Sequence, residues 1–212
     1  MELFLPKEGI ALEGELLLPS QAKSVVLFAH GSGSSRHSPR NQYVAGVLQS
    51  AGIGTLLFDL LTLEEDTAYE TRFNIKLLTR RLAAATAWLR QRPETEALAL
   101  GYFGASTGAA AALWAAAELG RQIGAVVSRG GRPDMAMHAL PEVSAPTLLI
   151  VGGRDEAVIQ WNQEAYEHLR CVKELRIVPG ATHLFEEPGT LEKVAELAKD
   201  WFQNHLGVKS EA

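Results

Sequence analysis

The chain has 212 residues, of which 47% are hydrophobic and 21% are charged, with a formal net charge of −5 at pH 7. This composition is typical of an ordinary globular domain and argues against a disordered chain. The acidic balance argues against nucleic acid as a partner, and no apolar run reaches the roughly 18 residues of a membrane-spanning helix. A chain of this length fits one domain, expected to cover residues 1–212.

Cysteine content and the amino terminus predict a cytoplasmic protein. Cys171 is the single cysteine, so an intramolecular disulfide cannot form. Residues 1–6 lack the basic and apolar regions of a secretory signal.

Short apolar runs alternate with longer helical patterns along the chain. The predicted strands are residues 12–18, 25–29, 55–59, 97–103, 125–128, 147–151 and 174–178, and the predicted helices are residues 41–51, 72–91, 108–120, 159–170 and 191–205. Most of the strands are near-continuous in Val, Leu, Ile and Ala, as in parallel strands covered on both faces, whereas residues 12–18 alternate and predict an antiparallel edge. The alternation predicts an α/β fold with a doubly wound, mostly parallel sheet, whose chemistry lies in the strand-to-helix loops.

The most specific motif is Gly-Ala-Ser-Thr-Gly at residues 104–108, between a predicted strand and a predicted helix. A sharp turn in this context holds the central residue in a strained conformation and needs small neighbours on either side. Ser106 is therefore the candidate nucleophile, above a helix amino terminus that favours negative charge. The alternative is that Ser106 only caps the helix.

A serine hydroxyl needs a base and a third group that orients the base. Asp155 and His183 each follow a predicted strand, in the chain order Ser, Asp, His. Taken singly, Asp155 could be a turn or cap residue and His183 a solvated loop histidine. Taken together, the three residues predict a catalytic triad.

The segment His-Gly-Ser-Gly at residues 30–33 follows the strand at 25–29 and is expected to complete an oxyanion hole. The backbone amides of Ser32 and Thr107 are the two predicted donors, and His30 is expected to brace the loop rather than act as a base.

With these motifs, the chain resembles the α/β-hydrolase superfamily and is most similar to its small, lidless dienelactone-hydrolase-like branch. The resemblance implies a carboxylic ester hydrolase that cleaves a small ester or lactone through an acyl-enzyme on Ser106. Namesake members carry cysteine at the nucleophile position, so the serine here leaves the dienelactone substrate open. The alternatives are a thioesterase or other acyl hydrolase, and a non-catalytic binding protein of the same fold.

Arginines recur in the loops expected to border the nucleophile. Arg36, Arg129 and Arg132 are candidates for binding a carboxylate or phosphate of the substrate, and Arg40 and Arg72 are further basic residues of the same group. The alternative is that they are solvated surface arginines. The histidines lack the spacing of a metal site, and no cofactor-binding motif is present, so we expect no metal and no cofactor. The expected assembly is a monomer or small homo-oligomer.

Overall fold

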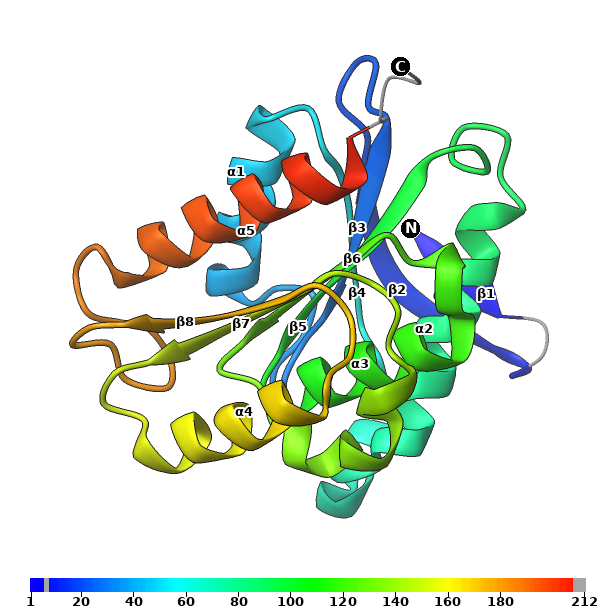
Figure 1. The fold of residues 1–212 in the computed structure, drawn as a ribbon. Helices are drawn as coiled ribbons and strands as arrows, with labels where there is room; N and C mark the ends of the chain where they lie inside the picture. The colour runs from blue at the N-terminus through cyan, green and yellow to red at the C-terminus, as the bar shows by residue number, and fades with distance from the viewer. Residues whose placement is uncertain (6–7, 208–212) are drawn as a thin grey trace.

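The computed structural model describes residues 1–5 and 8–207, so that residues 6–7 and 208–212 of the predicted domain lie outside the described part. Eight strands form one sheet in the order β1-β2-β4-β3-β5-β6-β7-β8 (Figure 1). The strands are β1 (Glu2–Leu5), β2 (Ile10–Leu17), β3 (Ser24–Ala29), β4 (Gly54–Phe58), β5 (Ala99–Ala105), β6 (Ala125–Arg129), β7 (Thr147–Gly152) and β8 (Lys173–Val178). All predicted strands are present.

The sheet is parallel from β4 to β8, and an antiparallel pair stands at its amino-terminal edge. β2 pairs with β4 in antiparallel register, with Gly14 opposite Phe58, and β1 pairs with β2. The sequence placed the edge strand at residues 12–18, but the outermost strand is β1. Its four residues are too short a run to give a clear alternating signal.

Alternate residues of each central strand contribute to different cores. In β3, Val25 and Leu27 pack into one hydrophobic cluster, while Val26 and Phe28 pack into the other. Because successive side chains point to opposite faces and both faces are buried, the strand reads as a continuous apolar run.

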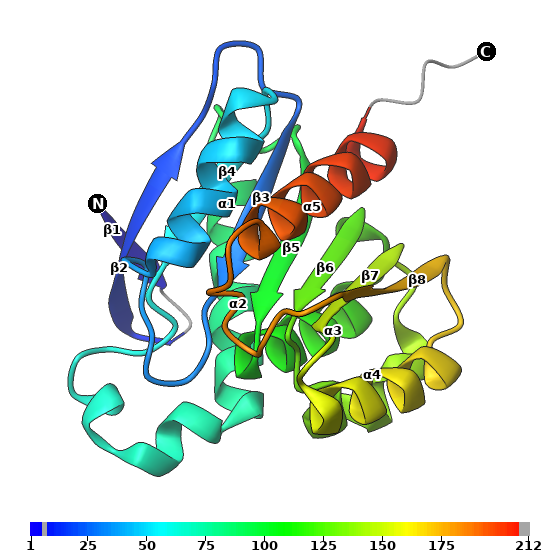
Figure 2. The ribbon, with the colours of Figure 1, turned by 90° about the vertical axis from the view of Figure 1, so that its left-hand side faces the viewer.

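Helices cover both faces of the sheet. They are α1 (Pro39–Ser50), α2 (Ile75–Arg90), α3 (Thr107–Leu119), α4 (Glu156–His168) and α5 (Thr190–Leu206). α1 and α5 lie together on one face, and α2, α3 and α4 lie on the other (Figures 1 and 2). Among the described residues, no helix is long and apolar enough to cross a membrane.

Three connections in the described ranges contain 3₁₀ helices that the sequence did not predict, and one of these helices is η3 (Gly120–Gln122), between α3 and β6. η1 (Glu65–Thr67) and η2 (Tyr69–Phe73) join β4 to α2, and η4 (Pro133–Glu142) joins β6 to β7. Figure 2 shows the η1 and η2 segment, in blue-green, extending beyond the end of the sheet. α1 also begins two residues before its predicted start, because Ser38 caps it and Pro39 occupies its first turn.

Candidate active site

Ser106 lies at a sharp turn between β5 and α3, with a backbone φ of 51° and ψ of −120°. A non-glycine residue with positive φ is strained. A Cβ on Gly108 would lie 2.1 Å from the carbonyl oxygen of Ala29, and one on Gly104 would lie 2.4 Å from Cα of Ala109. Both neighbours must therefore be glycine for this turn to pack against β3 and α3.

His183 and Asp155 are in direct contact. Nδ1 of His183 lies 2.6 Å from Oδ2 of Asp155, a bond that joins the loop after β8 to the loop after β7. The carboxylate accepts this hydrogen bond, so the proton is on Nδ1 when the imidazole is neutral, and Nε2 is left as an acceptor.

Ser106 and Asp155 both occupy the residue before a helix, yet neither side chain caps its helix. The capping alternatives for these two residues therefore do not describe the structure. Ser106 and His183 line one pocket, although no hydrogen bond joins their side chains in the described part of the chain. Such hydrogen bonds are commonly long in free enzymes and tighten when substrate binds.

Backbone packing holds the two loops that carry Asp155 and His183. A Cβ on Gly152 would lie 2.5 Å and 2.6 Å from the carbonyl oxygens of Ala181 and Thr182, so only glycine lets the loops approach this closely. Glu187 accepts a hydrogen bond of 3.0 Å from the backbone N–H of Thr182, which lowers the pKa of this carboxyl. The sequence analysis did not identify Glu187 as a support for this loop.

The loop after β3 lies against the Ser106 turn. A Cβ on Gly31 would be 3.1 Å from Cβ of Ser106, and Ser32 lines the same pocket as Ser106. Thr107 is the first residue of α3, where a backbone N–H has no acceptor within the helix. The two predicted oxyanion donors thus belong to segments that adjoin Ser106.

His30 connects this loop to the end of β4. Its Nε2 accepts a hydrogen bond of 3.0 Å from the backbone N–H of Leu60, and its Nδ1 lies 3.0 Å from the carbonyl oxygen of Gly31. Burial lowers the pKa of His30, against the opposing effects of the Gly31 hydrogen bond and of Asp59 and Asp66. His30 is therefore neutral and acts as a brace.

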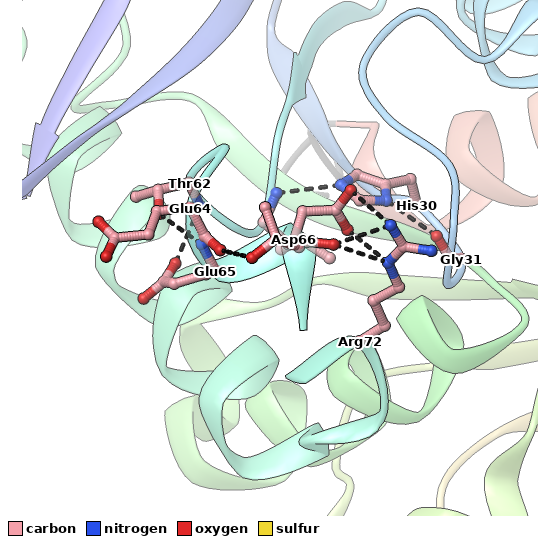
Figure 3. A network of polar contacts seen from close by, with 9 residues as sticks. His30, Gly31, Thr62, Glu64, Glu65, Asp66 and Arg72 are labelled. Carbon is pink, nitrogen blue, oxygen red and sulfur yellow. Dashed lines mark hydrogen bonds and ion pairs between the residues drawn. The ribbon is translucent and has the colours of Figure 1, made fainter. Parts of the chain in front are cut away.

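A second brace lies beside His30 (Figure 3). The guanidinium of Arg72 forms a two-pronged ion pair with Asp66, at 2.8 Å and 3.0 Å. Together with His30 and Gly31, these two residues line a small space beside the loop that follows β3. Arg72 is thus already paired with Asp66. The two residues belong to the segment of η1 and η2 and lie against the loop that follows β3.

The pocket at Ser106 has a volume of about 300 Å³. Besides the predicted residues Ser32, Ser106, Arg129 and His183, its lining includes Ser34, Ser38, Arg40, Asn41 and Leu184. Most of these additional lining residues were not predicted from the sequence. The Ser38-Pro39 pair is a common helix start, and it could have placed the first turn of α1 next to the pocket. A larger and more open groove of about 580 Å³ lies over α1 near Lys199 and contains no candidate nucleophile and base together.

The three arginines predicted to bind substrate have different surroundings in the structure. Arg129 lines the pocket. Arg36 does not, because its guanidinium and backbone N–H both bind Asp59. Arg132 does not either: it forms bonds of 2.9 Å and 2.8 Å to Asp134 and packs over the ring of Trp161. The expectation that Arg36 and Arg132 face the substrate does not fit these contacts.

No group of three or more His, Cys, Asp or Glu side chains in the described ranges gathers as a metal site would require. Burial raises the pKa of the Cys171 thiol, and its Sγ lies 3.7 Å from the hydroxyl of Thr147, the first residue of β7. Cys171 is thus at the opposite end of that strand from the Ser106 pocket.

The strand order and the serine turn together define an α/β-hydrolase fold, as the sequence predicted. Residues 62–207 match the model of the dienelactone hydrolase family, and the chain belongs to this family. It is 56% identical to a crystal structure described as a dienelactone hydrolase from Anabaena variabilis, with a TM-score of 0.94 over 97% of this chain and 96% of that one.

Two further comparisons bear on architecture and length. The fold matches that of a Xanthomonas campestris protein described as an α/β serine hydrolase without lid. The TM-score is 0.78 and the sequence identity 22%, over 99% of this chain and 95% of the other. Proteins from two Mycobacterium tuberculosis strains, which bear the provisional name phosphoribosyl transferase, are 58% identical over 93% of this chain. The chain spans only 44% of those relatives.

Proposed function

We propose that this protein is a serine hydrolase that cleaves a small carboxylic ester or lactone through an acyl-enzyme on Ser106. The observation that carries the proposal is the 2.6 Å bond between His183 and Asp155 beside a pocket that also contains the strained Ser106. An imidazole held by a carboxylate is the base that a serine hydroxyl needs.

In the first half of the reaction, Nε2 of His183 accepts the proton of Ser106 as Oγ bonds to the acyl carbon. The backbone N–H groups of Ser32 and Thr107 donate to the oxygen that becomes negative, and Asp155 stabilises the imidazolium. The tetrahedral intermediate then collapses: the ester C–O bond breaks, and the leaving alkoxide takes the proton from His183.

In the second half, water replaces the alcohol. His183 accepts a proton from water as its oxygen attacks the acyl carbon. The second intermediate breaks the bond to Oγ, Ser106 recovers the proton, and the carboxylic acid leaves. A thioester would follow the same steps with a thiolate leaving group, because the triad does not distinguish leaving groups.

Hydrolysis of short p-nitrophenyl esters tests this proposal. Ser106→Ala is expected to lower kcat by at least about 10³-fold, and Asp155→Asn by about 10⁴-fold, because the asparagine favours the wrong imidazole tautomer. Glu156→Gln, next to Asp155 but exposed, is the matched control and should keep full activity. Turnover by Ser106→Ala within tenfold of the parent would refute the mechanism.

A non-catalytic binding protein of this fold is the alternative from another class. It predicts that the parent protein hydrolyses no ester above the background rate.

A further inference from the structure

Two arginines, Arg129 and Arg40, line the Ser106 pocket, and the charge of Arg40 acts on Arg129. Arg129, the last residue of β6, is only 7% exposed. Its Nε and Nη1 atoms are buried and have no hydrogen-bond partner in the part of the chain that the structure describes. Nε of Arg40 is buried and unpartnered as well.

Other arginines near the site differ from Arg129. Arg36, Arg72 and Arg132 are each bound to an aspartate. No carboxylate among the described residues pairs with Arg129, and its guanidinium lies 5.9 Å from the centre of the Phe185 ring. Arg40 has one acidic contact, at 3.4 Å to Glu186, whose side chain is 64% exposed and remains hydrated.

A buried cation without a counter-ion is costly, and a second cation nearby adds to the cost. Burial first, and then the charge of Arg40, lower the pKa of Arg129 to about 10. Arg129 therefore stays charged at neutral pH and lacks the anion that would compensate it.

The amino terminus of α1 also lines this pocket. Ser38, Arg40 and Asn41, from the cap and first turn of this 12-residue helix, line the pocket with Ser34. The first turn contains no acidic residue. Partial positive charge at a helix start, together with serine hydroxyl groups, favours an oxyanion ligand.

We propose that Arg129, Arg40 and the first turn of α1 form a phosphate-binding subsite beside Ser106, so that the substrate is a small ester or lactone bearing a phosphate monoester. Two guanidinium groups and a helix start match a dianion with three oxygen atoms, whereas one guanidinium fork is enough for a carboxylate. The phosphate is held and not transferred; the bond that breaks is the acyl C–O bond. The substrate assignment rests on the proposed function.

Binding is tested without catalysis by titrating inorganic phosphate into the Ser106→Ala protein by calorimetry at pH 7.5, with acetate as the carboxylate arm. Phosphate should bind saturably and at least about tenfold more tightly than acetate, and Arg129→Gln should weaken it at least about tenfold. Arg132→Gln is the matched control, because that guanidinium is already bound to Asp134, and it should bind phosphate unchanged. Equal affinity for acetate and phosphate, or unchanged phosphate affinity in Arg129→Gln, would overturn the subsite.

Kinetics then test the substrate class with two acetate esters, that of 2-hydroxyethyl phosphate and that of ethylene glycol. Arg129→Gln should raise KM for the phosphorylated ester at least about tenfold more than it raises KM for the neutral ester. Arg129→Lys keeps both positive charges and loses only the planar guanidinium fork, and Arg40→Gln keeps the buried Arg129. Both should give smaller rises in KM for the phosphorylated ester, and they serve as the test if Arg129→Gln does not fold. Phosphate binding without hydrolysis by the parent would defeat the serine mechanism alone, whereas hydrolysis without phosphate binding would defeat this subsite alone.

Discussion

At two helix starts in this protein, the residue that would ordinarily cap the helix uses its side chain differently. Asp155 precedes α4 and accepts a hydrogen bond from His183, and Ser106 precedes α3 and lies in the pocket. An aspartate or serine before a helix predicts a cap from local chemistry alone. The Gly-Ala-Ser-Thr-Gly motif around Ser106, together with the order and spacing of Ser106, Asp155 and His183 along the chain, indicated the other role.

His30 is a residue whose charge state the fold dictates. Its ring accepts the N–H of Leu60, and burial lowers its pKa. Below about pH 6.5 the His30 imidazole therefore binds a proton in the unfolded chain but stays neutral in the folded protein until the pH is lower still. The free energy of unfolding should therefore fall as the pH drops below about 6.5, and the contribution of His30 should be fully present above this pH.

Replacing this ring gives a direct measurement. His30→Gln is expected to lower the free energy of unfolding at pH 8, because a buried brace is lost, and to flatten its decline between pH 7 and pH 5 in urea titrations. His168→Gln changes an exposed ring and should leave the decline as in the parent. A decline equally steep without His30 would show that this residue is not its source.

At the scale of elements, the serine turn depends on how closely α3 approaches β3. Gly108 faces the backbone of Ala29 and His30, which cannot move away as a flexible side chain can. Gly46, in the middle of α1, has no atom within 4 Å of an added Cβ. Alanine at position 108 therefore tests the effect of close packing, whereas alanine at position 46 tests helix propensity alone.

Gly108→Ala should lower the free energy of unfolding by about 3 kcal/mol through overpacking. Gly46→Ala should raise it by about 0.5 to 1 kcal/mol, because alanine is the better helix former. Chemical denaturation of both variants measures these changes. A small effect of alanine at position 108 would mean that the turn does not require this close approach.

Hydrophobic periodicity predicted the helices and the central strands because both cores draw on long apolar patterns. It missed β1 and the 3₁₀ helices, since these are short and lack a repeating pattern. It also began α1 too late, although Ser38 and Pro39 were a readable start signal. That error left Arg40 in a loop, away from the helix turn that faces the pocket.

At the scale of the molecule, one parallel sheet gathers loops from distant parts of the chain at a single edge. This rule allowed the grouping of Ser106, Asp155 and His183 to be predicted from sequence. The rule does not predict which arginine side chain lines the pocket, because this depends on which arginines form ion pairs with an aspartate in the fold. The pairing of Arg132 with Asp134 spans two residues and was readable, whereas that of Arg36 with Asp59 spans 23 and appears only in the fold.

The central claim is that His183 and Asp155 make Ser106 a nucleophile, and covalent labelling by a fluorophosphonate followed by peptide mass spectrometry measures this most directly. The account predicts one adduct, on Ser106, that forms at least about 10³-fold more slowly in His183→Ala. An unlabelled parent protein, or a label on another residue that forms equally fast without the imidazole, would contradict it.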